Sequence, residues 1–250
     1  MRKLISVALV VAVVLALTCA AAMAQRELTV EPVQPGNATG LNLGPSQGLV
    51  SCQVGNLNAA AFALFSFLTP PEDYKLLFLP SATCTACPAG FSVTKIHVYL
   101  QTKTACQVVL SVDVEDAVLQ SPGCYAPGPV RCQTALYNVS LPSAGLWNVG
   151  ITVAPAECTP CACLAAGRRY LLSVHFQSMT CTSANIALIT DAGPAVLCTN
   201  WNNYGPGWYD LLGAFPGWPG QLKFFADADC CSPPTPVEDS AWGRVKSLFR

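Results

Sequence analysis

Short apolar runs recur along the chain from about residue 49, and glycine, proline or other turn residues bound each of them. In Gln221–Asp227, for example, Leu222, Phe224 and Ala226 fall on one face of an extended chain, and polar residues fall on the other. Such alternation predicts strands with one buried face, and helical spacing is weak in this part of the chain. Ten strands are predicted, over Leu49–Val54, Ala60–Phe67, Lys75–Leu79, Ser92–Leu100, Gln107–Val114, Thr134–Val139, Leu146–Val153, Tyr170–Gln177, Asn185–Thr190 and Gln221–Asp227.

Many short strands with Gly- and Pro-containing connections are typical of antiparallel sheets packed face to face. We therefore predict an all-β domain over residues 48–231. The expected fold is an antiparallel two-sheet sandwich, jelly-roll-like rather than a barrel. The length of this segment suits one domain.

The start of the chain has the pattern of a secretory signal. Arg2 and Lys3 precede the apolar run Leu4–Ala22, and Ala22-Met23-Ala24 has the small residues of a cleavage site. Residues 1–24 are thus predicted to be a signal peptide, with no transmembrane anchor after its cleavage; a retained N-terminal helix is the alternative. Residues 25–47 are rich in Pro, Gly and Asn and predict an extended arm.

The end of the chain, residues 232–250, predicts a proline linker and an amphipathic tail. The linker is "SPPTP", and after it Val237, Ala241, Val245 and Leu248 recur at helical spacing. A helix this short is marginal alone in water, so we expect it to dock or to act in sorting. An inert terminus is the alternative.

Charge excludes some classes of partner. Without Arg2 and Lys3 the chain has 11 basic and 14 acidic residues, a formal charge of −3. A charge-poor, weakly acidic protein lacks the basic surface that nucleic acid or an anionic membrane requires.

Cysteine content predicts disulfides. Cys19 lies in the predicted signal, and thirteen cysteines remain, which allows six bridges and leaves one unpaired. Export favours disulfides over the alternative, a zinc site in which Cys84-x-x-Cys87 and Cys158-x-x-Cys161 are the two halves. The disulfide candidates are Cys52, Cys84, Cys87, Cys106, Cys124, Cys132, Cys158, Cys161, Cys163, Cys181, Cys198, Cys230 and Cys231.

Catalytic motifs are missing from the sequence. Neither G-x-S-x-G nor H-E-x-x-H occurs, and His97 and His175 lie inside predicted strands, where we expect sheet-face positions with satisfied hydrogen bonds. We predict no catalytic residue, no metal and no cofactor. Structural Ca²⁺ or Zn²⁺ is the less favoured alternative, with Asp113, Glu115 and Asp116 as the oxygen donors considered for Ca²⁺.

An aromatic segment, Asn200–Gly220, is the candidate ligand site. Tryptophan and tyrosine rings beside Asn and Asp are common on carbohydrate-binding surfaces, because sugars have apolar faces and polar edges. The predicted ligand-binding residues are Trp201, Asn203, Tyr204, Trp208, Tyr209 and Asp210. In the alternative interpretation, Trp208 and Trp218 pack over the open end of the sandwich and Asp210 caps backbone amides.

Several segments carry a family resemblance. The tail "TPVEDSAWGRVKSLFR" resembles C-terminal tails of uncharacterised secreted cysteine-rich bacterial proteins, and "LITDAGP", "GWYDL" and "PGQLKFFADADCC" are similar to pieces of the modules that such proteins carry. A looser likeness reaches adhesin-like jelly-roll modules. The resemblance implies export, surface display and a binding or structural role, and it supplies no catalytic residues.

The predicted function is that of a non-enzymatic exported surface protein that binds an extracellular glycan or surface protein, or has a structural role. The alternative is a secreted hydrolase or hydrolase inhibitor that uses acidic residues at a sandwich-end loop, with Asp191 and Asp210 as the candidates.

Overall fold

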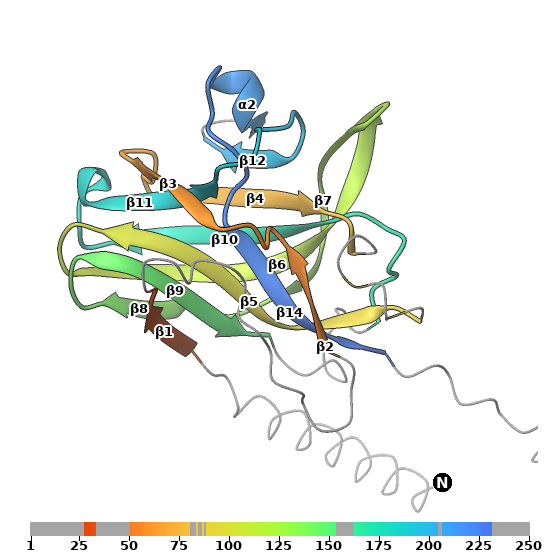
Figure 1. The fold of residues 1–250 in the computed structure, drawn as a ribbon, viewed down its shortest axis with the longest axis horizontal. Coiled ribbons are helices and arrows are strands. Elements are labelled where there is room, and N and C mark those ends of the chain that lie inside the picture. Colours follow the sequence, from red (N-terminus) through yellow and green to blue (C-terminus); the bar gives the residue numbers. More distant parts are fainter. Residues whose placement is uncertain are drawn as a thin grey trace, which may run out of the picture.

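A computed structural model describes residues 28–33, 51–80, 84, 87, 89–153, 163–204 and 207–231. These residues form two seven-stranded sheets, and every pairing between strands is antiparallel (Figure 1). The prediction of an all-β two-sheet sandwich is confirmed. The predicted signal peptide, linker and C-terminal helix lie outside the described residues.

The first sheet has the strand order β1-β9-β5-β11-β3, and β14 pairs with both β5 and β2. β5 is therefore its central strand, since it contacts β9 on one side and β11 and β14 on the other. The bounds are β1 Leu28–Pro32, β2 Ser51–Gly55, β3 Ala60–Phe65, β5 Phe91–Thr102, β9 Gly145–Thr152, β11 Ile186–Asp191 and β14 Phe224–Cys230.

The second sheet has the order β13-β12-β4-β10-β6-β7, and β8 also pairs with β6. The chain passes back and forth between the sheets from β3 to β6 and again from β8 to β12, in the manner of a jelly roll. The bounds are β4 Glu72–Phe78, β6 Cys106–Ser121, β7 Cys124–Gln133, β8 Tyr137–Leu141, β10 Tyr170–Met179, β12 Asn200–Asn203 and β13 Trp208–Asp210; the short helices are η3 Ser183–Asn185 and α2 Leu211–Ala214.

The core lies between the two sheets because alternate residues of each strand point inward. Leu172, Val174 and Phe176 of β10 face Phe224 and Ala226 of β14 across the sandwich, and all five are at most 1% exposed. This alternation is the period-two pattern of the sequence. It leaves the residues between them, such as Ser173 and His175, on the outer face of the second sheet.

Four strands of the structure were not predicted: β1, β7, β12 and β13. β1 is the part of the predicted arm that pairs with β9 at the edge of the first sheet. β7 contains Pro127 and Pro129, which suggest a loop, but it pairs on one side only, with β6, where proline is tolerated. β12 and β13 are short, and β12, with the sequence NWNN, has no apolar alternation.

Five disulfides staple the described residues: Cys52–Cys84, Cys87–Cys230, Cys106–Cys181, Cys124–Cys198 and Cys163–Cys231. Cys132 is also disulfide-bonded, and no described cysteine is free. Cys84 and Cys87 thus belong to two different bridges rather than to half of a zinc site. Cys158 and Cys161 lie outside the described residues.

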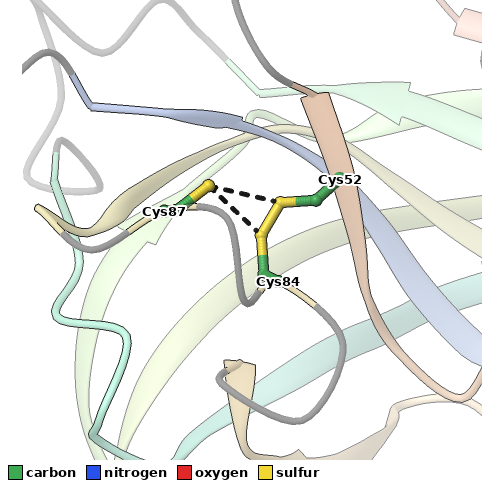
Figure 2. A group of neighbouring side chains, drawn as sticks. All are labelled: Cys52, Cys84 and Cys87. Carbon is green, nitrogen blue, oxygen red and sulfur yellow. Dashed lines mark hydrogen bonds between the residues drawn. A yellow bond between two sulfur atoms is a disulfide. The ribbon is translucent and has the colours of Figure 1, made fainter.

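Two of these bridges are neighbours. The Sγ atom of Cys87 lies 3.7 Å from that of Cys52 and 3.5 Å from that of Cys84. Figure 2 shows the Cys87 sulfur pointing at the Cys52–Cys84 disulfide. This group joins β2, the loop before β5 and, through Cys230, the end of β14.

Candidate functional site

The aromatic segment begins at a loop that Asp210 organises. Its carboxylate accepts hydrogen bonds from the backbone amides of Cys198, at 2.7 Å, and Gly213, at 2.7 Å, and it caps helix α2. The Cys124–Cys198 disulfide ties the same loop to β7. Asp210 therefore has the backbone-capping role of the alternative interpretation.

The three tryptophans of this segment are not a single exposed platform. Trp218 is 4% exposed and packs edge-on against Phe67 in the core. Trp201 is 5% exposed and packs with Leu171 and Ala126 on the outer face of the second sheet, where the β6–β7 hairpin covers it. Trp208 is partly buried, and its ring lies 3.8 Å from the ammonium nitrogen of Lys75.

The tyrosines, in contrast, are free to contact a ligand. Tyr204 is 65% exposed and Tyr209 is 41% exposed. Tyr204 lies at the end of β12 and lines a cleft, whereas Asn203 is half-buried and its side chain hydrogen-bonds to Asp73. Of the six predicted ligand-binding residues, Tyr204 is the one that lines this cleft.

The cleft, hereafter the α2 cleft, has a volume of about 280 Å³ and lies between the β3–β4 connection, β12 and α2. It combines aromatic rings with hydrogen-bonding groups, the mixture expected of a carbohydrate site. Its lining consists of Ser66, Phe67, Thr69, Glu72, Tyr74, Asn202, Tyr204, Leu211 and Phe215. Figure 1 shows α2 and β12 together at one end of the molecule.

Glu72 is the one carboxyl group in the described lining of the α2 cleft. Its Oε2 atom accepts hydrogen bonds from the amide of Thr69 and the hydroxyl of Tyr74, both at 2.9 Å. Burial raises the pKa of Glu72, although these two hydrogen bonds partly oppose the change. Both bonds end on Oε2, and Glu72 as a whole is 5% exposed at the wall of the cleft.

A second polar site lies on the outer face of the second sheet. Its residues, hereafter the charged cluster, come from three neighbouring strands and share one face: Asp73 and Lys75 of β4, Ser173 and His175 of β10, and Asp113 and Glu115 of β6. Lys75 and Asp113 flank Ser173 directly in the register. Asp113 and Glu115 are two residues apart in β6 and share a face, whereas Asp116, the third acid considered for Ca²⁺, points away and pairs with Arg131 at 2.6 Å.

Lys75 and Glu115 form an ion pair inside the charged cluster, and each is 2% exposed. Burial raises the pKa of Glu115, the nearby charge of Asp113 raises it further, and Lys75 partly offsets both. A buried pair of this kind is costly to break, because the remaining charge is left without a partner.

His175 lies between two carboxylates, with Nδ1 2.7 Å from Asp73 and Nε2 2.5 Å from Asp113. Burial disfavours its charged form, but the hydrogen bonds and charges of Asp113 and Asp73 outweigh that effect and raise the pKa of His175 to about 9. In turn, burial would raise the pKa of Asp73, yet the His175 contact holds it below its ordinary value. His175 is thus a sheet-face histidine with satisfied hydrogen bonds, as predicted.

The other histidine, His97, has a similar setting on the outer face of the first sheet. Its ring nitrogens lie 3.1 Å from Asn148 and 3.1 Å from Asp227, and the ring stacks on Phe225. Burial opposes the charged form of Asp227, but hydrogen bonds from His97 and Gln53 hold the pKa of that carboxyl below its usual value.

The two acids of the hydrolase alternative are both held in structural roles. Asp191 is fully buried, and its carboxylate accepts bonds from Gly193 N, Gln221 N and Asn58 Nδ2. Asp210 is occupied by the two amides described above. The resemblance segments "LITDAGP" and "PGQLKFFADADCC" therefore meet at Asp191, where they hold the loop before β14 in place.

Several residues of the α2 cleft and the charged cluster were not predicted from the sequence. Glu72, Asp73 and Lys75 lie in one short strand, and nothing in its pattern shows that β10 and β6 bring His175, Asp113 and Glu115 beside it. The alternation of charged and apolar residues in Glu72–Phe78 is the only signal in the sequence that a strand here has a polar outer face.

Together these features define a class: a disulfide-stapled, antiparallel β-sandwich domain with a small aromatic cleft at one end and a buried charged cluster on one sheet. The chain belongs to the family described as "Domain of unknown function (DUF7451)", which matches residues 51–228. No curated protein matches the sequence. Within the described residues, no helix is long and apolar enough to span a membrane.

Two solved structures show weak likeness to the chain. One is of the cysteine protease and lectin-like domains of Cwp84, a surface layer associated protein of Clostridium difficile, with 12% identity and a TM-score of 0.40. The match covers 64% of this chain and 32% of that one. The other is the same clostridial protease after propeptide cleavage, with 13% identity, a TM-score of 0.44, and coverage of 72% and 40%. Likenesses of this strength support no argument about function.

Proposed function

We propose that the protein is an exported, non-enzymatic binding protein that holds a glycan in the α2 cleft. The observation that carries the proposal is the lining of that cleft, in which the exposed rings of Tyr204 and Phe215 stand beside Glu72 and Asn202. Rings can contact the apolar face of a sugar, and the carboxyl and amide groups can bind its hydroxyls.

The single carboxyl group favours binding over hydrolysis. Most glycosidases use two carboxylates on either side of the scissile bond. Glu72 has no second carboxyl opposite it among the described lining residues, and Asp191 and Asp210 are held by backbone amides.

Disulfides support export. Five bridges link distant parts of the described chain, and such bridges form and persist in oxidising compartments. One of them, Cys124–Cys198, also anchors the loop that leads into β12 beside the cleft, and restricting that loop lowers the entropy lost on binding.

A glycan array probed with the purified domain tests the proposal, followed by titration of the best ligand. Tyr204→Ala is expected to weaken binding about tenfold, because about 1.5 kcal/mol of ring burial is lost. Tyr209→Ala is the matched control. Tyr209 is also an exposed tyrosine, but it lies outside the cleft lining, so its loss should leave affinity unchanged.

Two results would contradict the proposal. Equal loss of binding in both variants would place the ligand elsewhere on the surface. Turnover of a glycan that Glu72→Gln abolishes in a folded protein would instead support the hydrolase alternative, with Glu72 in place of the two predicted acids.

A further inference from the structure

His175 is held as metal-binding histidines usually are. Its Nδ1 atom bonds to Asp73 Oδ1 at 2.7 Å, which fixes the ring so that Nε2 points toward Asp113. A carboxylate that orients the far nitrogen of a histidine is the usual support of a zinc ligand. One ligand atom each from Asp113, Glu115 and His175 lie within 4.8 Å of one another.

The charged cluster also contains polar atoms without a partner. Asp113 Oδ1, Glu115 Oε2 and Ser173 Oγ are buried and make no hydrogen bond, and their residues are at most 2% exposed. Leaving such a group unsatisfied carries the full cost of its desolvation, so native proteins rarely do so without a reason. Two of the three belong to the candidate ligands themselves.

Charge points to the kind of ligand. Three carboxylates, those of Asp73, Asp113 and Glu115, converge on the cluster, and Lys75 and the imidazole of His175 are the basic groups that contact them. A cation between His175 Nε2 and Asp113 adds positive charge where carboxylates are in excess, and any proton on Nε2 leaves to solvent when the ion binds.

The setting excludes a larger ligand. Lys75, Asp113 and Glu115 are almost fully buried beneath the outer face, whereas the His175 and Asp73 side chains are 21% and 25% exposed. An ion can enter beside His175, but a sugar cannot reach the unpartnered oxygens. Imidazole with carboxylates is a donor set that suits zinc.

We propose that Asp113, Glu115 and His175 bind one divalent transition-metal ion, for which Zn²⁺ is the best match, with Asp73 as the positioning residue for His175. Zinc–ligand bonds of about 2.0–2.2 Å require only a small inward movement of these side chains. The site is independent of the α2 cleft.

Titration of the metal-free, disulfide-intact protein with ZnCl₂, followed by calorimetry, tests the proposal. One equivalent should bind, and the melting temperature should rise as zinc is added, because an ion that binds only the folded state stabilises it. Asp73→Asn should weaken zinc binding about 10- to 100-fold while leaving all three ligands in place. His97→Gln is the matched control and should leave zinc affinity unchanged.

NMR gives a readout that does not depend on any variant folding. The chain contains two histidines, so the ring-nitrogen signals can be assigned to His175 and His97. Zinc should shift the His175 Nε2 signal and leave that of His97 in place. Failure to bind one equivalent, binding that His175→Gln leaves intact, or a zinc-soaked crystal with only ordered water in the cluster would each overturn the proposal.

Discussion

Lys223 shows how a single residue can make folding depend on pH. Its side chain is fully buried at the outer face of the first sheet, where Nζ donates to the carbonyl of Asn56 at 2.8 Å and lies 5.0 Å from the Phe225 ring. Burial lowers the pKa of Lys223 to about 8, and the charge of Asp191 partly opposes this change.

The pKa of Lys223 predicts that the contribution of this residue to stability rises with pH. Between pH 8 and 10.5 the unfolded chain keeps the lysine proton while the folded protein has lost it, so a higher pH favours the folded state. The contribution of Lys223 grows by about 2 kcal/mol from pH 7 to 9.5, whereas His175, whose pKa is raised to about 9, contributes stability that is lost over the same range. Lys223→Met removes this dependence, and denaturant unfolding of both proteins at several pH values measures it. Parallel pH profiles for the two proteins would show that Lys223 keeps its proton when folded.

Single residues also show which features of the site can be predicted from the sequence and which cannot. The shared face of Asp113 and Glu115 follows from strand alternation alone, because they are two residues apart. The burial of Trp201 does not, because it depends on the β6–β7 hairpin, whose Ala126 packs against it. Sequence patterns report the neighbours of a residue along its own strand, but not what folds over it.

Among the elements, the long strands were predictable and the short ones were not. Each of the ten predicted strands overlaps an observed strand, because a buried face imposes apolar alternation. β12 and β13 have four and three residues. They are held by the pairing of β12 with β4 and β13 and by the Cys124–Cys198 bridge rather than by a pattern of their own. The α2 cleft is built on these elements, so its lining could be predicted only in part.

Two disulfides of nearly equal span make it possible to distinguish the effect of a bridge on stability from its effect on the shape of the α2 cleft. Cys124–Cys198 encloses 74 residues and Cys106–Cys181 encloses 75, so chain entropy predicts the same loss, about 4 kcal/mol, when either is replaced by two serines. Only the first anchors the loop that leads into β12. We expect equal falls in unfolding free energy, measured with denaturant, but faster amide hydrogen exchange in β12 and α2 only in the Cys124/Cys198 variant. Equal exchange in both would show that the loop holds its shape without the bridge.

The molecule as a whole is completed by β14, which occupies an interior position in the first sheet. It pairs with β2 and β5, places Phe224 and Ala226 in the core, and ends at cysteines bonded to Cys87 and Cys163. The fold therefore depends on residues near the end of the sequence.

Truncation tests this dependence on β14. A chain that ends after Cys231 keeps every described residue and should melt within about 2 °C of the full chain, a shift of at most about 1 kcal/mol for a domain of this size. A chain that ends after Gly220 should not fold, because β2 and β5 lose their shared partner. Circular dichroism and thermal melting distinguish the two. A cooperative transition in the shorter chain would contradict the role assigned to β14.

The nearness of the Cys87 sulfur to the Cys52–Cys84 bridge has a consequence for redox chemistry. Disulfides exchange when a thiolate attacks a neighbouring sulfur, and 3.5 to 3.7 Å brings Cys87 within reach of both sulfurs of that bridge (Figure 2). Replacing Cys230 would release Cys87 as a thiol beside an intact disulfide. The unpaired position would then move among three cysteines, and a trapping reagent would label a mixture of them rather than one.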